Sequence, residues 1–279
     1  ERLELPIMGK QQSWDSAWDV YAMSTYNTIT SLSESVLNEN ILYAGTDDGL
    51  IHRTKDGGSS WTSITVDKLP GVPNSSFVND IKADLYNDQV AYVVLDNHKF
   101  GDYSPYLYKT SNGGKSWKPI VNGLPEDNFV WRIVQDHIDP NLLFLASEYG
   151  LYFSNNQGEK WIKFSTGLPT ISIRDLAIQK RENDLVLATF GRGFYVLDDY
   201  SSLRDINNEN SNQHLLFNVK EALQYYPIRS GTSSQGSSYF QSKNPPYGAI
   251  ITYNLPKSYK SLKSIRSERE KELDKLKKD

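Results

Sequence analysis

Apolar residues recur along this chain in groups that repeat four times. In each group the second apolar residue follows the first by 3 positions, and the third follows the first by 12. The groups are Ile29, Leu32 and Ile41; Val78, Ile81 and Val90; Val130, Ile133 and Leu142; and Ile173, Leu176 and Leu185. A fixed pattern of this kind indicates a repeat architecture, in which each repeat is one small supersecondary structure.

Each repeat is predicted to contain short strands, which we name A to D in chain order. Runs of β-branched and aromatic residues alternate there with turn residues. We expect strand A at 29–33, 78–83, 130–135 and 173–178, and strand B at 41–45, 90–95, 142–146 and 185–188. Strand C is expected at 50–54, 106–110, 151–154 and 194–197, and strand D at 61–65, 117–121 and 161–164. Repeated four-stranded antiparallel units of this size are typical of the blades of a β-propeller.

A second pattern lies between strands C and D of the first three repeats. It consists of Ser or Thr, any residue, Asp or Asn, any residue, Gly, any two residues and Trp. Its structural positions are Asp56, Gly58 and Trp61; Asn112, Gly114 and Trp117; and Asn156, Gly158 and Trp161. The Asp or Asn side chain can accept hydrogen bonds from the N–H groups of a tight turn, and Gly permits a positive φ. The Trp can bury its ring beneath the turn. We therefore predict a device that fixes a hairpin and takes no part in chemistry.

Composition narrows the class of protein and of ligand. The chain of 279 residues carries a net charge of −4, which argues against nucleic acid as a partner. It contains no Cys, which excludes disulfides, thiolate catalysis and zinc sites with Cys ligands. We see no apolar run long enough to cross a membrane, no phosphate-binding Gly loop and no cluster of His ligands. We expect no cofactor and no metal site.

The chain is predicted to be all-β, with a partial propeller followed by other segments. We assign residues 1–24 to a lead-in from a preceding blade and 25–199 to the blades, of which the fourth is degenerate and lacks the Trp motif. A polar linker is expected at 200–213, strands of a following β module at 214–256, and a charged tail, helical or disordered, at 257–279. Propellers close with four to eight blades. We therefore expect the remaining blades to come from a missing part of the chain or from another chain.

The three Trp motifs resemble the Asp-box, or bacterial neuraminidase repeat, of sialidases, xyloglucanase-like glycosidases and sortilin-type receptors. Residues 189–199, Thr-Phe-Gly-Arg-Gly-Phe-Tyr-Val-Leu-Asp-Asp, are similar to the closing segment of the propeller in large exported bacterial proteins of the sortilin-like or glycosyl-hydrolase-like family. Residues 244–249, Asn-Pro-Pro-Tyr-Gly-Ala, are similar to a later segment of the same family. The resemblance covers residues 25–260. It implies a long propeller followed by an immunoglobulin-like domain, and export to the cell surface, the periplasm or the medium.

The residue that opens the B–C loop is acidic in three successive repeats, as Asp47, Asp96 and Glu148, and in the fourth Gly191 and Arg192 stand there. A propeller has its B–C and D–A loops on one face, which we call the B–C face, and its A–B and C–D turns on the other, which we call the box face. Equivalent carboxylates of adjacent blades are therefore expected near a common mouth. They can serve as acid and base on a glycosidic bond, bind a cation or a polyhydroxylated ligand, or simply begin their turns.

The second repeat carries an insertion in its B–C loop, at 97–105, that contains His98, Phe100 and Tyr103. Aromatic residues with polar neighbours suit sugar rings or peptide side chains. His98 reads either as a general base, for which the sequence identifies no partner, or as a surface residue without a chemical role. Trp131, at the start of strand A of the third repeat, reads either as a stacking anchor or as a core residue.

The sequence thus predicts a non-catalytic binding or scaffolding segment that recognises a protein or glycan through its B–C face. The candidate contact residues are Asp47, Asp96, His98, Phe100, Tyr103, Trp131, Glu148 and Arg192. The alternative is a glycoside hydrolase, xyloglucanase-like or sialidase-like, that uses the carboxylates of this face.

Overall fold

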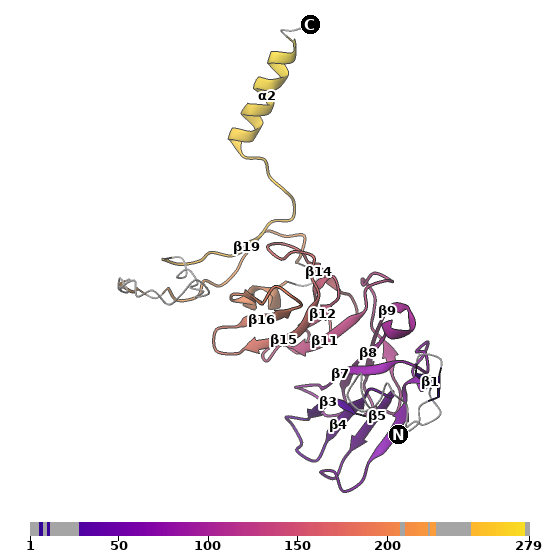
Figure 1. The fold of residues 1–279 in the computed structure, drawn as a ribbon. Helices are drawn as coiled ribbons and strands as arrows, with labels where there is room; N and C mark the ends of the chain where they lie inside the picture. Colours follow the sequence, from indigo (N-terminus) through magenta and orange to yellow (C-terminus); the bar gives the residue numbers. More distant parts are fainter. Residues whose placement is uncertain are drawn as a thin grey trace, which may run out of the picture. The chain divides into compact units, whose positions relative to one another are not determined.

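The structure is a computed structural model, and it describes residues 6–7, 10–11, 28–206, 210–222, 224–226 and 247–276. The chain divides into two compact units, Glu1–Arg204 and Asp205–Asp279. The first unit is built from β-sheets, and the α-helix found in the described residues belongs to the second (Figure 1). Each unit is therefore considered by itself.

Four antiparallel meanders follow one another along the first unit. Blade 1 contains β3 (Ile29–Glu34), β4 (Leu42–Thr46), β5 (Leu50–Thr54) and β6 (Thr62–Thr65). Blade 2 contains β7 (Phe77–Ala83), β8 (Ala91–Asn97), β9 (Asp102–Thr110) and β10 (Lys118–Pro119). Blade 3 contains β11 (Val130–Gln135), β12 (Leu143–Ser147), β13 (Gly150–Ser154) and β14 (Ile162–Phe164), and blade 4 contains β15 (Ile173–Gln179), β16 (Asp184–Thr189) and β17 (Phe194–Leu197). Each strand pairs with its neighbours in sequence, which confirms the predicted four-stranded blades and the degenerate fourth of a partial β-propeller.

A β-bulge at the start of every strand A explains the spacing of 3 in the apolar pattern. In blade 1, Ile29 pairs with Thr46 and Leu32 pairs with Ala44, so three steps along β3 match two steps along β4. The same register shift occurs after Val78, Val130 and Ile173. Because the bulge adds one residue to the two-residue period of a strand, both apolar side chains lie on the same face of the sheet.

The hydrophobic core lies between neighbouring blades. Tyr43 of blade 1 belongs to one buried cluster with Ile81 of blade 2, and similar clusters join blades 2 and 3 and blades 3 and 4. At the first junction a Cβ on Gly45 would lie 2.3 Å from Cγ1 of Val78. Only glycine allows this approach of two sheets, so Gly45 sets how closely blades 1 and 2 pack.

The Trp motifs hold the C–D hairpins through the contacts that their residue types allow. In the first motif, Thr54 Oγ1 donates to Asp56 Oδ1 at 2.7 Å and accepts from the N–H of Gly58 at 3.0 Å, while Asp56 Oδ1 also accepts from the N–H of Ser60 at 2.8 Å. The second and third motifs repeat this set around Asn112 and Asn156. The side chains therefore cap the N–H groups of the turn.

The prediction that each Trp is buried beneath its turn is wrong for Trp61. Trp117 and Trp161 are 8% and 2% exposed, but Trp61 is 44% exposed. The Trp reaches back to the preceding blade, as Trp161 does when its Nε1 donates to the carbonyl oxygen of Ile120 at 2.7 Å. No blade precedes blade 1 among the described residues, so Trp61, Ile29 and Leu32 form an uncovered apolar face.

The other end of the row of blades is also uncovered, because Phe194 and Val196 of β17 are exposed. Blade 4 ends in a 3₁₀ helix, η3 (Tyr200–Arg204), where strand D would begin. The N–H of Tyr200 donates to the carbonyl oxygen of Asn183, as Gly57 does to Asn40 in blade 1. The first unit thus extends to Arg204, whereas the sequence placed a linker from residue 200 onward.

The segment η3 is anchored to blade 3 by a buried ion pair. Arg204 donates from Nε and Nη2 to the two oxygens of Asp136, at 2.8 Å each, and the Tyr200 hydroxyl donates to Asp136 Oδ1 at 2.7 Å. Burial opposes ionisation of this carboxyl, but the hydrogen bonds from Arg204 and Tyr200 outweigh it and hold the pKa of Asp136 at about 2. Asp136 is therefore ionised and paired at neutral pH.

The second unit has little regular structure in its described residues. β18 (Leu215–Leu216) pairs with β19 (Tyr253–Asn254), and this two-residue pair is the strand structure of 214–256 in the part that is described, which leaves out 223 and 227–246. The charged tail forms α2 (Leu262–Leu276), one of the two states that the sequence allowed. The predicted lead-in is described only at β1 (Pro6–Ile7) and β2 (Lys10–Gln11), and the rest of it lies outside the described residues. In the described part of the chain, no helix has the length and hydropathy of a membrane span.

Candidate functional site

The four residues that open the B–C loops occupy equivalent positions at one end of the blades. The N–H groups of Asp47, Glu148 and Phe190 donate to the carbonyl oxygens of Thr28, Phe129 and Ser172, which precede strand A. The sequence placed Gly191 and Arg192 at this position of the fourth repeat, and that prediction is wrong, because Ile173 pairs with Thr189 and the loop therefore opens at Phe190. In blade 2, Asp96 is paired with Phe77 at the same place. The Trp motifs instead bond to the A–B turns at the other end of the sheets. The acidic residues and the motifs therefore lie on opposite faces, as the sequence predicts.

Asp47 has a local contact. Its Oδ1 accepts a hydrogen bond from the N–H of Thr28 at 2.8 Å, and the side chain is half-buried. This contact fixes the approach to β3, which is the turn-forming role that an Asp at this position can have.

Asp96 forms a dyad with His98. The side chain is fully buried, its Oδ1 accepts from the N–H of His98 at 2.8 Å, and its Oδ2 contacts His98 Nδ1 in a very short hydrogen bond. A carboxylate oxygen accepts hydrogen bonds, so the proton of this contact lies on His98 Nδ1, and Asp96 fixes the orientation of the ring. The sequence identified no partner for His98, and the structure supplies Asp96.

His98 belongs to an aromatic cluster that crosses from blade 2 to blade 3. Its ring stacks on Phe129 with centroids 5.1 Å apart and meets the edge of Trp131 at 5.8 Å. Phe129 and Trp131 are 5.0 Å apart, and Tyr103 contacts Phe129 at 6.0 Å. Such contacts stabilise more than burial alone, so the cluster stabilises the junction of blades 2 and 3 on the B–C face.

Glu148 connects this cluster to blade 4. Its Oε2 accepts from Trp131 Nε1 at 3.0 Å and from Ser172 Oγ at 2.7 Å, and it lies 3.7 Å from Arg174 Nη2. The guanidinium of Arg174 lies over the Trp131 ring, at 3.7 Å from its centroid, and also over Phe190 at 5.1 Å. The carboxylate therefore positions Trp131 and Arg174, and the ring of Trp131 is covered.

The insertion in blade 2 is mostly an extension of two strands. After Asp96 the chain makes one 3₁₀ turn, η2 (His98–Phe100), and β9 already begins at Asp102, whose pairing with Asn97 continues the β8–β9 ladder. Asp102 is held by hydrogen bonds from the Tyr106 hydroxyl at 2.7 Å and the N–H of Ser104 at 3.1 Å. The predicted loop at 97–105 is thus an ordered hairpin that presents Phe100 and Tyr103.

Comparisons with known proteins give the fold and no family. No protein-family model and no curated protein matches the chain. Similar solved structures include a GH74 enzyme from Niastella koreensis, with a TM-score of 0.48, 16% identity, and coverage of 62% of this chain and 29% of that chain. They also include a GH74 xyloglucanase from Xanthomonas campestris, with a TM-score of 0.47, 11% identity, and coverage of 63% of this chain and 30% of that chain. A third is YCF48 from Cyanidioschyzon merolae, with a TM-score of 0.44, 16% identity, and coverage of 63% of this chain and 54% of that chain.

These neighbours are β-propeller proteins. The chain spans less than a third of the length of both GH74 enzymes and about half that of YCF48. The likeness concerns the fold alone at these identities. Membership of the Asp-box or sortilin-like family remains a prediction.

The structure brings five of the predicted site residues into one network, namely Asp96, His98, Tyr103, Trp131 and Glu148. Asp47, Phe100 and Arg192 have no described contact with it. The sequence interpretation did not select Phe129, Ser172, Arg174 and Phe190, which belong to it. Arg174 occupies the bulge position of β15, as Trp131 does in β11, so an alignment of the four bulges places these two side chains in adjacent blades.

Proposed function

We propose that this chain is a ligand-binding segment of a β-propeller that recognises a protein or glycan through its B–C face. The observation that supports this best is the network of hydrogen-bonded and stacked side chains next to an exposed aromatic rim. The Asp96–His98 dyad and the Glu148–Arg174 contact hold the aromatic rings from below. Phe100, Tyr103, Tyr149 and Phe190 are exposed on the same face and are available to a ligand. Exposed aromatic groups next to fixed charges are typical of binding surfaces.

We further propose that blade-like sheets cover the two uncovered faces of the row, namely the face of Trp61, Ile29 and Leu32 and the face of Phe194 and Val196. At each internal junction the equivalent side chains are buried by the neighbouring blade, which supports a blade as the occupant. Such blades belong to the same protein or to a partner chain. The resemblance to exported bacterial repeat proteins supports a place at the cell surface, in the periplasm or outside the cell.

The hydrolase alternative needs two carboxyl groups that reach a glycosidic bond. Asp96 is fully buried and both its oxygens are engaged by His98, and Oε2 of Glu148 is engaged by Trp131, Ser172 and Arg174. A general acid must donate its proton to the substrate, so these contacts favour positioning over catalysis. Hydrolysis is accordingly kept as an outcome of the experiment.

The experiment measures binding and turnover on the same preparations. The purified chain is applied to a glycan array and to a peptide display library, and reducing-sugar release is measured on xyloglucan, other β-glucans and sialosides. We expect saturable binding to one class without turnover. The double variant Phe100→Ala/Tyr103→Ala should lose most of the affinity, whereas Ile138→Ala, an exposed residue of a box-face turn, should keep it. Turnover that Glu148→Gln abolishes would establish the alternative, and binding that survives the double variant would exclude this rim.

A further inference from the structure

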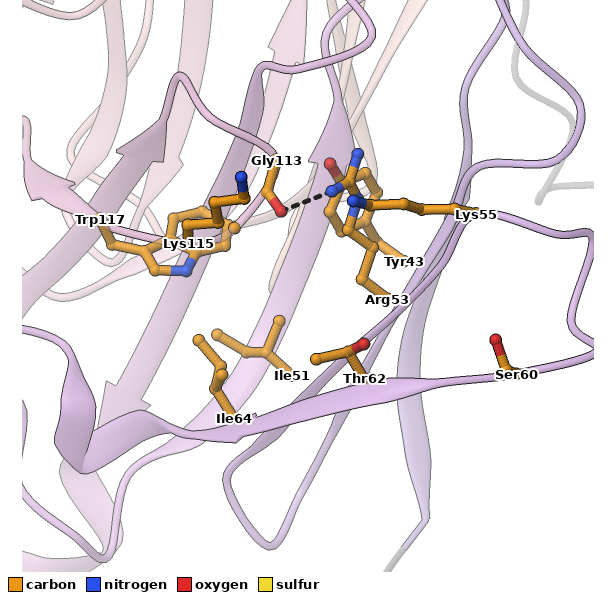
Figure 2. A pocket seen from close by; sticks show the side chains of 11 residues that line it. Tyr43, Ile51, Arg53, Lys55, Ser60, Thr62, Ile64, Gly113, Lys115 and Trp117 are labelled. Atoms are coloured by element: carbon orange, nitrogen blue, oxygen red, sulfur yellow. Dashed lines mark hydrogen bonds between the residues drawn. The ribbon is translucent and has the colours of Figure 1, made fainter.

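A cavity of about 380 Å³ opens between the first two Trp motifs, on the box face and therefore away from the site described above. Figure 2 shows its walls, which come from β5 and β6 of blade 1 and from the C–D turn of blade 2. Ile51, Ile64 and the Trp117 ring form its apolar part. Arg53, Lys55 and Lys115 form its charged part, and none of the eleven lining residues is acidic.

Arg53 is the central group of this cavity. Its side chain is 8% exposed, and its Nη1 donates to the carbonyl oxygen of Gly113 at 2.7 Å. Nε and Nη2 are buried without a hydrogen-bond partner among the described residues. These two nitrogens form one edge of the guanidinium plane, which is the edge that binds two oxygens of a carboxylate or phosphate at once.

Other donors in the cavity are also unsatisfied. Trp117 Nε1, which can only donate, and the Tyr43 hydroxyl are both buried with no hydrogen-bond partner in the described part of the chain. A buried donor without a partner destabilises the protein, because it has lost its hydrogen bonds to water and gained none. Several such donors around one space indicate that an acceptor belongs there. Lys55 and Lys115 lie on opposite sides of Arg53 in Figure 2 and add positive charge at the mouth.

The equivalent place between blades 2 and 3 provides an internal comparison. Lys109 replaces Arg53 and donates to Gln157 Oε1 at 2.6 Å, and the Tyr92 hydroxyl donates to Asp84 Oδ2 at 3.0 Å. Glu159 stands where the first junction has Lys115. The second junction thus has a side-chain acceptor for Lys109 and one for Tyr92, and it carries an acidic group.

The first junction has no amide or carboxylate acceptor at the places that Gln157 and Asp84 occupy in the second, because Gly113 and Ser35 stand there. Ser35 occupies the position of Asp84, because its N–H bonds to Ile41 as that of Asp84 bonds to Val90. The positive, donor-rich cavity is therefore a property of this junction and not of the repeat.

We propose that this cavity binds an oxyanion, the carboxylate or phosphate of a small ligand. The anion accepts from Arg53 Nε and Nη2 and from Trp117 Nε1, and the ligand body rests against Ile51 and Ile64. The position of Arg53 depends on Gly113, since a Cβ there would lie 2.2 Å from Nη1 and the residue has a φ of +66°.

The test uses ¹⁵N-labelled protein and follows the indole N–H signal of Trp117, identified by its loss in Trp117→Phe. Inorganic phosphate and glucuronate are titrated separately at constant ionic strength, with glucose and sodium chloride as controls. We expect a saturable shift with at least one of the two anions and none with glucose or chloride. The anion that binds more tightly tells a phosphate ligand from a carboxylate ligand.

Arg53→Gln should weaken the binding about tenfold or more, since it removes charged hydrogen bonds. Lys115→Gln, an exposed substitution that keeps the fold, should weaken it less, and Lys118→Gln, the same charge change elsewhere on this face, should leave it unchanged. The absence of a saturable shift with both anions would overturn the proposal. It would also be overturned if Lys115→Gln and a folded Arg53→Gln both bound the anion as tightly as the unchanged protein. Equal losses in Lys115→Gln and Lys118→Gln would also overturn it, because they indicate binding by net charge alone. If Arg53→Gln does not fold, the two lysine variants decide.

Discussion

The guanidinium of Arg174 lies over the ring of Trp131, with 3.7 Å between its central carbon and the ring centroid. The two residues come from the bulges of neighbouring blades, and Glu148 contacts both. Cation–π stacking of this kind joins blade 3 to blade 4 on the B–C face. It also covers the ring, so a ligand meets the exposed rim residues rather than Trp131.

Replacing Arg174 with Ala should lower the free energy of unfolding by about 1 kcal/mol, because the stacking on Trp131 is lost. Urea titration followed by tryptophan fluorescence measures this change. Arg181→Ala is the matched control, since Arg181 is an exposed arginine of the same blade that contacts the neighbouring Glu182. We expect almost no effect from the control. Equal effects of the two variants would contradict a stabilising role of the stack.

Trp161→Ala should destabilise the chain by about 3–5 kcal/mol, as large-to-small substitutions of buried aromatic residues do. The same substitution at Trp61 should cost less than half as much, because that ring is 44% exposed. Thermal unfolding of the two variants in parallel gives the comparison. A larger loss at Trp61 would mean that its apolar face is covered in solution by another copy of the chain, which gel filtration detects.

Asp136 should make stability depend on acidity. Its pKa is about 2 in the folded chain and 3.8 in an unfolded one, so its contribution is complete above about pH 4 and is lost as the pH falls through 2. Asp136→Asn should lower the free energy of unfolding at pH 7 by about 3–5 kcal/mol, because Arg204 loses its buried partner. The difference between the two proteins should shrink between pH 4 and 2. Denaturant titrations over this range measure it, and a constant difference would contradict the assignment.

Asp56→Asn should leave the first hairpin intact at pH 7. The second and third motifs already have Asn at this position, and their side chains accept the same N–H hydrogen bonds. Asp56→Ala should lower the melting temperature, because the N–H of Ser60 loses its acceptor. Calorimetry of the two variants tests this. A fall in Asp56→Asn as large as that in Asp56→Ala would show that the charge of Asp56, and not its acceptor atoms, holds the turn.

The blades could be predicted because the apolar pattern repeats a local geometry. The offset of 3 between Val130 and Ile133 reflects a bulge, and the offset of 12 to Leu142 reflects one A–B hairpin, so each offset depends only on the chain between those residues. No strand D was predicted for blade 4, because no Trp motif follows its strand C. The structure has the 3₁₀ helix η3 at that place. The extent of the first unit was missed because Arg204 is bound to Asp136, far away in sequence.

The site was predicted only in part, because its contacts join residues whose proximity the repeat pattern does not determine. The acidic series Asp47, Asp96 and Glu148 follows from the register, but each partner is set by conformations that the pattern does not encode. The bonding of Asp96 to His98 needs the 3₁₀ turn after β8. The cavity at Arg53 was not foreseen at all, because its donors are recognised as unsatisfied only when the neighbouring blade is in place.

The backward reach of the motif tryptophan gives the row of blades a direction. Trp161 hydrogen-bonds to Ile120 in the blade made before it. Synthesis proceeds from the N-terminus, so each motif Trp of blades 2 and 3 leaves the ribosome after the blade that receives its indole. Blades 2 and 3 can therefore bury Trp117 and Trp161 against a blade that was made earlier, and neither has to wait for a later blade.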